Sequence, residues 1–594
     1  MNLKYTAHEQ WQVEYPNTEK ERSHTIASNS NYEYQEAVLQ NKRRITTLLI
    51  AVIFACMFFV GILHYQDYGV SVDEMIQRQH SLIAYKYVMK QVFQRDVQEL
   101  EDYPSVPEYE NRYYGTFLQM PMVFLEDLHD FQTDLGDVMR TRHLITFVYC
   151  FISYICFYFL GKRVFQNRWL ALLGSVMLYL YPRFFATQFF YIKDMLFAAT
   201  FMAAMWATVL FIEKEEKPLY GILFCIVSAI CANVRFIGML FPALVIAYLL
   251  IRDLFIRRVY RNGVKAVLRS LIVPALLAIG FLVVYVAIHP TCWVTPLRSM
   301  VAVIKKFSYY DTWQGTSLFM GQWVPWNDVP WSFIPVWLLI SLPVWYQLLF
   351  LCALVLSVLL IVFPKRFSKR MFPLQAVEAK QTLLEALLQA PYRYVLFALA
   401  LFLGPLLLVI LRKSVLYGDW RQMYFLLVPY VFLAQFAVFA FIRFCNRNWL
   451  KTTAALAICG ALLFQTGWIV KNHPYEHQYL NSFAVPYRTQ FLRDTTRTSL
   501  YNAIKYLLKH AEEDVIVINS NVENLIVVQF QVLLLTPEEQ SRIRFEPDGM
   551  YELADYRLVV GNNVSHDGYE LWYTIYVEGC PIASVLRNAS RAAD

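Results

Sequence analysis

The sequence of 594 residues is poor in charge, since Asp, Glu, Lys and Arg make up only 17% of it while hydrophobic residues make up 57%. A soluble protein of this length needs a more polar surface. The same composition excludes disorder, a coiled coil and collagen. The net charge of +7 is modest, and the basic residues lie in short loops between apolar runs. We therefore expect an α-helical polytopic membrane protein and no nucleic-acid partner.

The common nucleotide and hydrolase motifs are also missing, because the chain has no P-loop, GxGxxG, GxSxG or CxxC. No cleavable signal peptide is indicated, since the first apolar run begins only at Ile45, after Lys42-Arg43-Arg44. Of the ten cysteines, only Cys292 and Cys580 lie clearly outside apolar runs. The sequence offers little support for a disulfide between them and indicates no structural metal.

Apolar runs close to the roughly 20 residues that cross a bilayer recur along the chain and predict about 11 transmembrane helices. They cover residues 45–63, 144–161, 169–190, 195–212, 219–234, 236–251, 271–288, 340–363, 394–411, 423–442 and 452–470. Residues 1–41 are polar without a hydrophobic period, which predicts a disordered cytoplasmic tail. Residues 42–470 then form the transmembrane domain, with long outer loops at 64–143 and 289–339.

Lys and Arg set the orientation, because they are enriched in cytoplasmic loops. With the N-terminus inside, those loops hold most of the basic residues, and an odd number of spans places residues 471–594 outside. We expect a multi-pass protein of the plasma (inner) membrane with an extracytoplasmic C-terminus. In residues 471–594, Ser499–Ala511 has a helical pattern, while 515–518, 556–560 and 571–577 resemble strands. A small α/β domain is predicted.

Two acidic positions stand out near the outer ends of spans. Asp73-Glu74 follows the first span by about ten residues, and a carboxylate there could act as a general base for a substrate from outside. The alternative is a solvated loop acid. Asp194 lies beside Lys193 between two aromatic stretches, where a charge is costly unless it has a role. The alternative for this pair is a snorkelling anchor.

Cations and aromatic residues form the second set of candidates. Arg235 is the only charge in a long apolar stretch, and Arg421 lies at the mouth of the tenth span. Guanidinium groups suit phosphate, although either residue could be an interfacial anchor. Trp326 belongs to a Trp- and Pro-rich segment that could form a stacking wall or an ordinary aromatic belt. His473 and Tyr475 lead out of the last span and could cap the same cavity.

The ordered set of these motifs resembles the GT-C glycosyltransferases. The branch is the bacterial one related to protein O-mannosyltransferases and to the lipid A aminoarabinose transferase (glycosyltransferase family 39-like). The similar segments are Val72-Asp73-Glu74, Pro182-Arg183-Phe184-Phe185 with Lys193-Asp194, Asn233-Val234-Arg235-Phe236-Ile237-Gly238, Val324-Pro325-Trp326 with Ile334-Pro335-Val336-Trp337, Leu416-Tyr417-Gly418-Asp419-Trp420-Arg421 and His473-Pro474-Tyr475-Glu476-His477-Gln478-Tyr479-Leu480-Asn481. They cover the membrane region between residues 67 and 481. Gln422 and Tyr191 depart from the family pattern, which often has His and Asn there.

The resemblance implies an inverting transfer of a sugar from a polyprenyl-phosphate donor to a hydroxyl group of a lipid, glycan or protein on the outer face. Asp73 would take the acceptor proton. Glu74 and Asp194 would position the acceptor, orient Asp73 or hold a divalent cation, and the need for a metal stays open. The adjacent Asp73 and Glu74 could also exchange roles.

The same resemblance implies that the remaining candidates bind substrate, and the cations among them would stabilise the leaving phosphate. The candidates are Arg183, Lys193, Arg235, Trp326, Trp420, Arg421, His473 and Tyr475. Two other functions remain open from the residues alone. A transporter or lipid flippase would be expected to show internal repeats and charges near the bilayer midplane, neither of which is evident. A non-enzymatic scaffold for envelope assembly would use the outer tail as its binding module.

Overall fold

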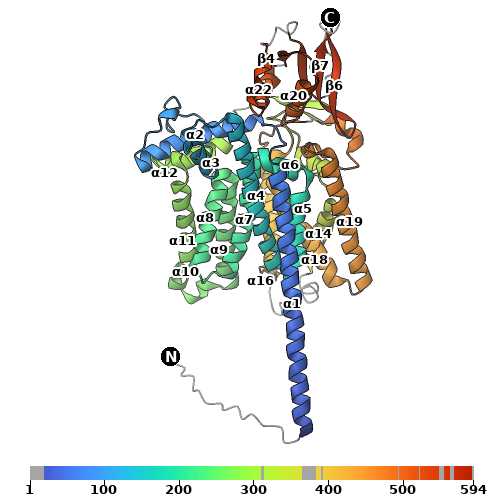
Figure 1. Ribbon diagram of the computed structural model, residues 1–594. Helices are drawn as coiled ribbons and strands as arrows, with labels where there is room; N and C mark the ends of the chain where they lie inside the picture. Colours follow the sequence, from blue (N-terminus) through green and yellow to red (C-terminus); the bar gives the residue numbers. More distant parts are fainter. Residues whose placement is uncertain are drawn as a thin grey trace. The chain divides into compact units, whose positions relative to one another are not determined.

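The computed structural model describes residues 19–308, 314–363, 383–388, 392–491, 494–520, 522–546, 554–561 and 568–590 (Figure 1). The chain forms two units, residues 1–61 and residues 62–594. The described part of the first unit is helix α1, which runs from Glu19 to His64 and so continues just past the boundary. The sequence predicted little fixed structure up to residue 41. Residues 1–18 of that tail lie outside the described residues, but helix is present from Glu19 onwards.

Helices occupy all the predicted apolar runs. Within the described residues, nine helical segments are long and apolar enough to cross a membrane. They are Val38–His64 of α1, α4 (Leu135–Phe165), α7 (Ile192–Glu213), Phe236–Ile256 with α9 (Leu240–Ile251), Val264–Ala287 with α10 (Val264–Ser270) and α11 (Ile272–Ala287), α14 (Val344–Val362), α17 (Tyr392–Leu411), Arg421–Phe444 with α18 (Leu427–Phe444), and α19 (Asn448–Asn472). The chain is a multi-pass membrane protein, as predicted.

The two remaining apolar runs have unusual shapes. Helices α5 (Arg168–Leu180) and α6 (Pro182–Phe190) form one pair with a bend of 66°. The bend follows from Pro182, because proline cannot continue the hydrogen bonding of a preceding helix. Helix α8 (Pro218–Val234) has 17 residues and is short for a span. These two elements account for the difference between eleven predicted spans and the nine long helices of the described chain.

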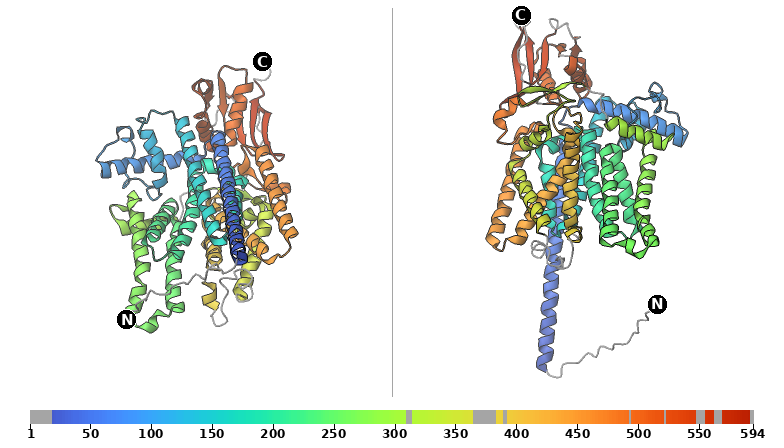
Figure 2. Two further views of the ribbon diagram at one scale, coloured as in Figure 1. Left: turned by 60° about the horizontal axis from the view of Figure 1, so that its bottom comes forward. Right: turned by 180° about the vertical axis from the view of Figure 1, so that it is seen from behind.

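Burial separates central helices from peripheral ones in the second unit. In α7 and in Arg421–Phe444, 78% and 83% of the most apolar window is buried, whereas α14 and α19 bury 22% and 11%. The last two expose apolar side chains such as Leu351 and Phe464, which suits contact with lipid. Figure 2 shows α7 and α18 among the other helices from two further directions. The central helices carry the residues of the candidate site.

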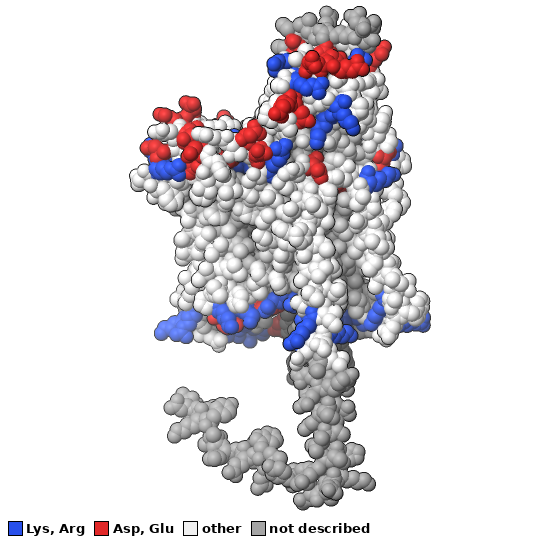
Figure 3. All heavy atoms as spheres, viewed as in Figure 1, with Lys and Arg blue, Asp and Glu red and all other residues white. Residues whose placement is uncertain are grey.

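Short elements lie across the ends of the spans on the side of the C-terminal domain (Figure 1). They are α2 (Val72–Phe93), α3 (Met120–Asp127), α12 (Pro296–Ser308), the hairpin β1 (Thr316–Phe319) and β2 (Gln322–Pro325), and α13 (Phe333–Ser341). We call this side of the second unit the domain end. Figure 3 shows acidic side chains gathered here, while Lys and Arg line the opposite ends of the spans.

The C-terminal domain is the predicted α/β unit. Helix α20 (Ser499–His510) precedes β3 (Ile516–Asn519), and the further elements are α21 (Val522–Val532), α22 (Pro537–Ser541), β4 (Ile543–Phe545), β5 (Tyr556–Val560), β6 (Tyr569–Val577) and β7 (Cys580–Asn588). The sheet order is β4-β3-β5-β7-β6, with β3 parallel to both neighbours and the other pairs antiparallel. No disulfide joins Cys292 and Cys580.

The domain shares its hydrophobic core with the segment that follows the first span and with the start of α4. Val70, Val138 and Met139 are buried in the same cluster as the apolar residues of α20 and the sheet. The side chain of Gln531 in α21 bonds both the N–H of Val70 at 2.9 Å and its C=O at 2.7 Å. Because Val70 lies two residues before the start of α2, the C-terminal domain fixes the place where that helix begins.

Candidate functional site

Four charged residues from separate parts of the chain meet at the domain end. The guanidinium of Arg421 pairs with Asp73, and its Nη1 lies 3.9 Å from Asp194 Oδ2. Arg235 pairs with the other oxygen of Asp194. Asp194 is buried and Arg421 is nearly so, whereas the Asp73 side chain is 37% exposed. The sequence singled out all four residues separately, and the structure joins them in one group, here called the charge cluster.

Helix ends place these side chains. Asp73 lies in the first turn of α2 and Asp194 in the first turn of α7, where the helix dipole stabilises a carboxylate. Arg235 caps the C-terminal end of α8, where the dipole favours a cation. Arg421 follows a tight turn in which Gly418 has φ +76°, and its N–H donates to Asp419 at 2.8 Å. The cluster is therefore built on backbone that the fold holds in place.

Aromatic rings hold the cations of this region. The guanidinium of Arg421 lies 4.9 Å from the centroid of the Tyr191 ring and 5.0 Å from that of Tyr417. The ammonium of Lys193 lies 3.6 Å from the centroid of Tyr114. Such contacts attract a cation electrostatically without neutralising it. Tyr191 stands where the family often has Asn, and here it supplies a face for Arg421.

Donors in the cluster are left over. Within the described residues, the buried Nε atoms of Arg235 and Arg421 have no hydrogen-bond partner, and no ion pair is formed by Lys193. Buried donors normally have partners, and an unsatisfied one costs about 1–3 kcal/mol. Within the cluster two arginines balance the two carboxylates of Asp73 and Asp194, and the neighbouring Lys193 adds a further basic group. The cluster thus has the spare donors to bind an anion.

Glu74 faces away from this cluster although it neighbours Asp73. It is fully buried, and one oxygen accepts the N–H of Ser71 at 2.6 Å in a capping box. The other lies 2.7 Å from His143 Nε2. These contacts fix the first turn of α2. The geometry suits Glu74 for positioning the helix and leaves Asp73 as the exposed acid.

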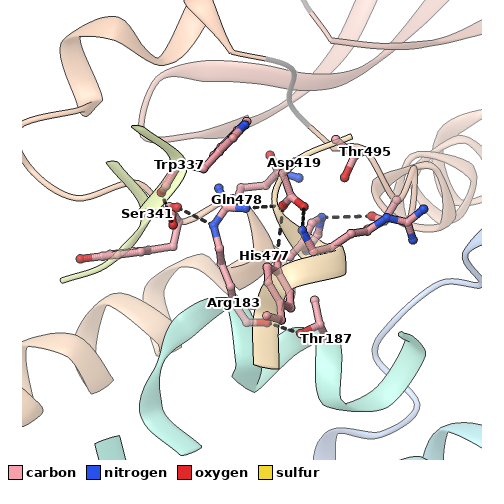
Figure 4. A network of polar contacts seen from close by, with 12 residues as sticks. Arg183, Thr187, Trp337, Ser341, Asp419, His477, Gln478 and Thr495 are labelled. Atoms are coloured by element: carbon pink, nitrogen blue, oxygen red, sulfur yellow. Dashed lines mark hydrogen bonds and ion pairs between the residues drawn. The ribbon is translucent and has the colours of Figure 1, made fainter. Parts of the chain in front are cut away.

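A second polar network lies beside the cluster (Figure 4). The guanidinium of Arg183 pairs with Asp419 at 2.5 Å, donates to the C=O of Tyr479 at 3.0 Å and lies over the ring of Trp337. Because Asp419 also accepts the N–H of Arg421, the two networks are joined. The second network borders a small pocket, which is lined by Arg183, Tyr191, Trp337, Asp419, Tyr424, His477, Gln478, Asp494, Thr495 and Thr496.

The buried carboxyl of Asp494 is part of this pocket wall. Burial by itself raises the pKa of that carboxyl, but hydrogen bonds from His477, Ser499 and Thr496 outweigh burial and lower the pKa below its ordinary value. Asp494 is therefore a negative charge that fixes the segment after the last span. Sequence reasoning did not single it out, because an isolated acid in a polar loop has no distinguishing pattern.

The two tryptophan candidates, Trp326 and Trp420, pack against residues of the site. The Trp326 ring packs on Tyr417 with centroids 5.5 Å apart, and its Nε1 donates to Ser317 at 2.8 Å. Trp326 thus supports the ring that faces Arg421. Trp420 is fully buried against Tyr424, and we expect it to shape the site from behind.

His473 and Tyr475 lie in other surroundings. His473 is bonded to Asp67 and Glu476, and Tyr475 packs against the core of the C-terminal domain. In the described part of the chain, no contact joins either side chain to Arg421. Their expected role as a cap over the same cavity has no support in these contacts and stays a prediction.

Three residues that were not among the predicted site residues also shape the site. Tyr114 faces Lys193, His143 holds Glu74 and Asn233 ties both long loops together. The amide of Asn233 accepts the N–H of Phe117 at 3.2 Å and donates to the C=O of Ile288 at 3.3 Å. Asn233 does stand in the turn that ends in Arg235, which was a usable signal. The other two carry none, because their partners are far away in the sequence.

Comparisons with known proteins agree with the motifs. Residues 128–283 match the family model described as dolichyl-phosphate-mannose-protein mannosyltransferase. This match confirms the predicted family resemblance over a segment that contains Arg183, Lys193, Asp194 and Arg235. No curated protein matches the chain.

Two solved structures are similar to this chain. ArnT from Cupriavidus metallidurans bound to undecaprenyl phosphate is 12% identical, with 91% of this chain and 97% of that chain covered and a TM-score of 0.43. The archaeal oligosaccharyltransferase AglB from Archaeoglobus fulgidus, in complex with an inhibitory peptide and a dolichol-phosphate, is 13% identical. The coverage is 83% of this chain and 64% of that chain, with a TM-score of 0.39.

Proposed function

We propose that this chain is a GT-C glycosyltransferase that moves a sugar from a polyprenyl-phosphate donor to a hydroxyl acceptor. The family match over residues 128–283 supports the reaction class and a lipid-phosphate donor. The observation that carries the proposal is the charge cluster, in which two arginines with spare buried donors surround one accessible carboxylate.

The acceptor is activated at Asp73. Its carboxylate is the more exposed acid of the cluster, and an acceptor that approaches from the domain end reaches it first. Asp73 takes the proton of the acceptor hydroxyl as that oxygen attacks the anomeric carbon of the donor sugar. The bond between this carbon and the phosphate oxygen breaks, and the electron pair leaves with the lipid phosphate. Attack opposite the leaving group inverts the anomeric configuration.

The leaving phosphate gains negative charge as the bond breaks, and the cations stabilise it. Arg235 and Arg421 direct their free N–H groups to its oxygens, and Lys193 adds a third positive charge. Donors that are held in place before the reaction stabilise such charge strongly. Arg183 is committed to Asp419, so it acts through the position of the Tyr417–Arg421 turn.

A divalent cation has no step in this reaction. Asp73 and Asp194 both face the guanidinium of Arg421, so Arg421 supplies the positive charge that a metal would bring between them. Asp194 then orients Arg235 and Arg421 through its two oxygens. Its role is to keep both cations aimed at the phosphate while the sugar is transferred.

The topology fits a donor that lies in the membrane. The cluster lies at the domain end of the spans, where the polar group of a membrane lipid also lies. We place the domain end on the extracytoplasmic side, because Lys and Arg line the opposite ends. On that side of a plasma membrane nucleotide sugars are absent, so a lipid-linked donor is required. The acceptor is a lipid, glycan or protein hydroxyl.

The substitution Asp73→Asn tests the proposal, because it keeps the shape and removes the basicity. Transfer of labelled sugar from polyprenyl phosphate should fall by roughly a hundredfold or more, the scale of a lost general base, while donor affinity changes little. Glu74→Gln should be milder in turnover and should lower thermal stability, because Glu74 holds the start of α2.

The control is Asp328→Asn, the same substitution in an exposed acid at the same end of the spans. Turnover of this variant should equal that of the wild type. Near-wild-type turnover in Asp73→Asn, with normal expression and a verified donor, would remove the base assignment. Movement of the lipid across the membrane without any transfer would instead favour a flippase, and failure of both reactions with every donor would favour a scaffold.

A further inference from the structure

Two histidines and one aspartate converge at a place that the transfer reaction does not use. Nδ1 of His64 lies 2.7 Å from Oδ2 of Asp67, and Nε2 of His473 lies 2.9 Å from the same oxygen. One potential ligand atom of each residue lies within 4.8 Å of the other two. We propose that these three side chains bind a divalent transition cation of the Zn²⁺ class.

The donor set selects the kind of metal. Two imidazole nitrogens and one carboxylate oxygen suit Zn²⁺, which binds such sets with water in a fourth position. Mg²⁺ and Ca²⁺ prefer oxygen ligands throughout and fit poorly. Zinc bonds of about 2 Å in a tetrahedron separate the ligand atoms by about 3.3 Å. The two distances to Asp67, 2.7 and 2.9 Å, therefore need to open by only about half an ångström.

A second observation points to the same use of His473. Its other ring nitrogen, Nδ1, lies 2.6 Å from Oε1 of the fully buried Glu476. The other oxygen of Glu476, Oε2, accepts the hydroxyl of Tyr68 at 3.1 Å. A carboxylate on the outer nitrogen of an imidazole fixes the ring and its tautomer, as is usual behind metal-binding histidines. Nε2 of His473 is thereby aimed at Asp67.

The three proposed ligands are accessible to a metal ion and come from separate segments of the second unit. The side chains of His64 and Asp67 are 39% and 42% exposed, so a hydrated ion can reach them. All three ligands belong to the second unit, because its boundary precedes His64. His64 ends α1, Asp67 begins the segment that leads to α2, and His473 follows α19. A bound ion would link three segments at the domain end. One of its ligands, Asp67, lies six residues before Asp73 in the sequence.

Metal binding by the purified full-length chain tests this proposal directly. Protein in detergent is stripped with a chelator and titrated with Zn²⁺, with Mg²⁺ in a parallel arm and Co²⁺ as a coloured probe. We expect one Zn²⁺ per chain, a higher Tm with Zn²⁺ than with Mg²⁺, and visible absorption of Co²⁺ that zinc removes. His64→Ala and His473→Ala should each weaken Zn²⁺ binding at least a hundredfold.

The hydrogen bond from His473 to Glu476 is tested by a variant whose Zn²⁺ affinity should lie between those of the wild type and the histidine variants. Glu476→Gln should weaken Zn²⁺ binding by about 10–100-fold without abolishing it, the usual effect of losing such an outer partner. The matched control is His129→Ala, because His129 is exposed and lies outside the cluster. This control should bind zinc like the wild type.

Two results would overturn the site. One is a wild-type chain without stoichiometric Zn²⁺ binding, and the other is equal binding by wild type, His64→Ala and His473→Ala. Where His473→Ala fails to fold, His64→Ala decides, since the half-exposed His64 side chain has little packing to lose. These readouts do not depend on sugar transfer, so the metal site and the proposed function can fail separately.

Discussion

Arg421 provides the sharpest test of phosphate binding. Its side chain holds Asp73 and Asp194 and lies between the rings of Tyr191 and Tyr417, yet its Nε–H is buried without a partner in the described chain. Arg421→Gln removes the charge and keeps part of the length. A lost charged hydrogen bond costs about 1.5–3 kcal/mol, so Kd for the donor should rise about 10–150-fold.

Replacement by lysine separates charge from geometry. Arg421→Lys keeps a cation that can lie against the rings of Tyr191 and Tyr417, a contact worth about 0.5–1 kcal/mol or more. It loses the planar fork that could hold a carboxylate and a phosphate together. We therefore expect Kd between that of the wild type and that of Arg421→Gln. Arg235→Gln should resemble Arg421→Gln, because Arg235 also keeps a free buried Nε–H.

The assay is equilibrium binding of a fluorescent polyprenyl-phosphate sugar to the protein in lipid nanodiscs. Arg298→Gln is the matched control, since Arg298 is an exposed arginine of α12 at the same end of the spans. Unchanged Kd in both Arg421→Gln and Arg235→Gln would reduce these residues to interfacial anchors. The phosphate half of the proposed mechanism would then be lost.

Three further outcomes follow from the fold. A cysteine in place of the exposed Glu570 should react with an impermeant maleimide in intact cells. A cysteine in place of the exposed Arg447 should react only after lysis. The opposite pattern would show that the proposed topology is inverted. Gly115→Ala would place a methyl carbon 1.8 Å from the C=O of Asn233, so Tm and donor affinity should both fall, and an unaffected melt would contradict this packing. Gln531→Ala leaves the buried N–H and C=O of Val70 unpaired, which should lower the free energy of unfolding by about 2–6 kcal/mol. Turnover should change by a larger factor than the Kd for the donor.

The spans were predictable because a bilayer imposes a simple rule. A helix in hydrocarbon must be apolar over about 20 residues, and every predicted run is helical in the structure. The exceptions have local causes that hydropathy averages away. Pro182 bends one run by 66°, and α8 is too short to count as a full span. Hydropathy also cannot detect a polar helix, and α1 begins at Glu19 in a polar segment without a hydrophobic period to mark it.

The charge cluster was predictable in its members and not in its connections. Asp194, Arg235 and Arg421 stood out because a charge in an apolar setting is costly unless it has a partner or a role. The structure gives them partners, since they pair with one another. Which cation faces which carboxylate depends on how four separate segments pack. That packing follows from contacts far apart in the sequence, such as Gln531 with Val70, which have no local signature.

The pair Asp73 and Glu74 shows most clearly where sequence reasoning ends. Neighbours in a helix point about 100° apart, so only one of two adjacent acids can face a given site. The choice is made by His143, which lies on α4 and takes Glu74 into a buried hydrogen bond. Asp73 is thereby turned to Arg421 and keeps 37% of its side chain exposed, as its proposed role as a base requires. His143→Ala should therefore reduce turnover through the position of Asp73, and Glu74→Gln should reproduce its effect. Additive losses in the double variant would contradict this link, because residues that act through one hydrogen bond lose it only once.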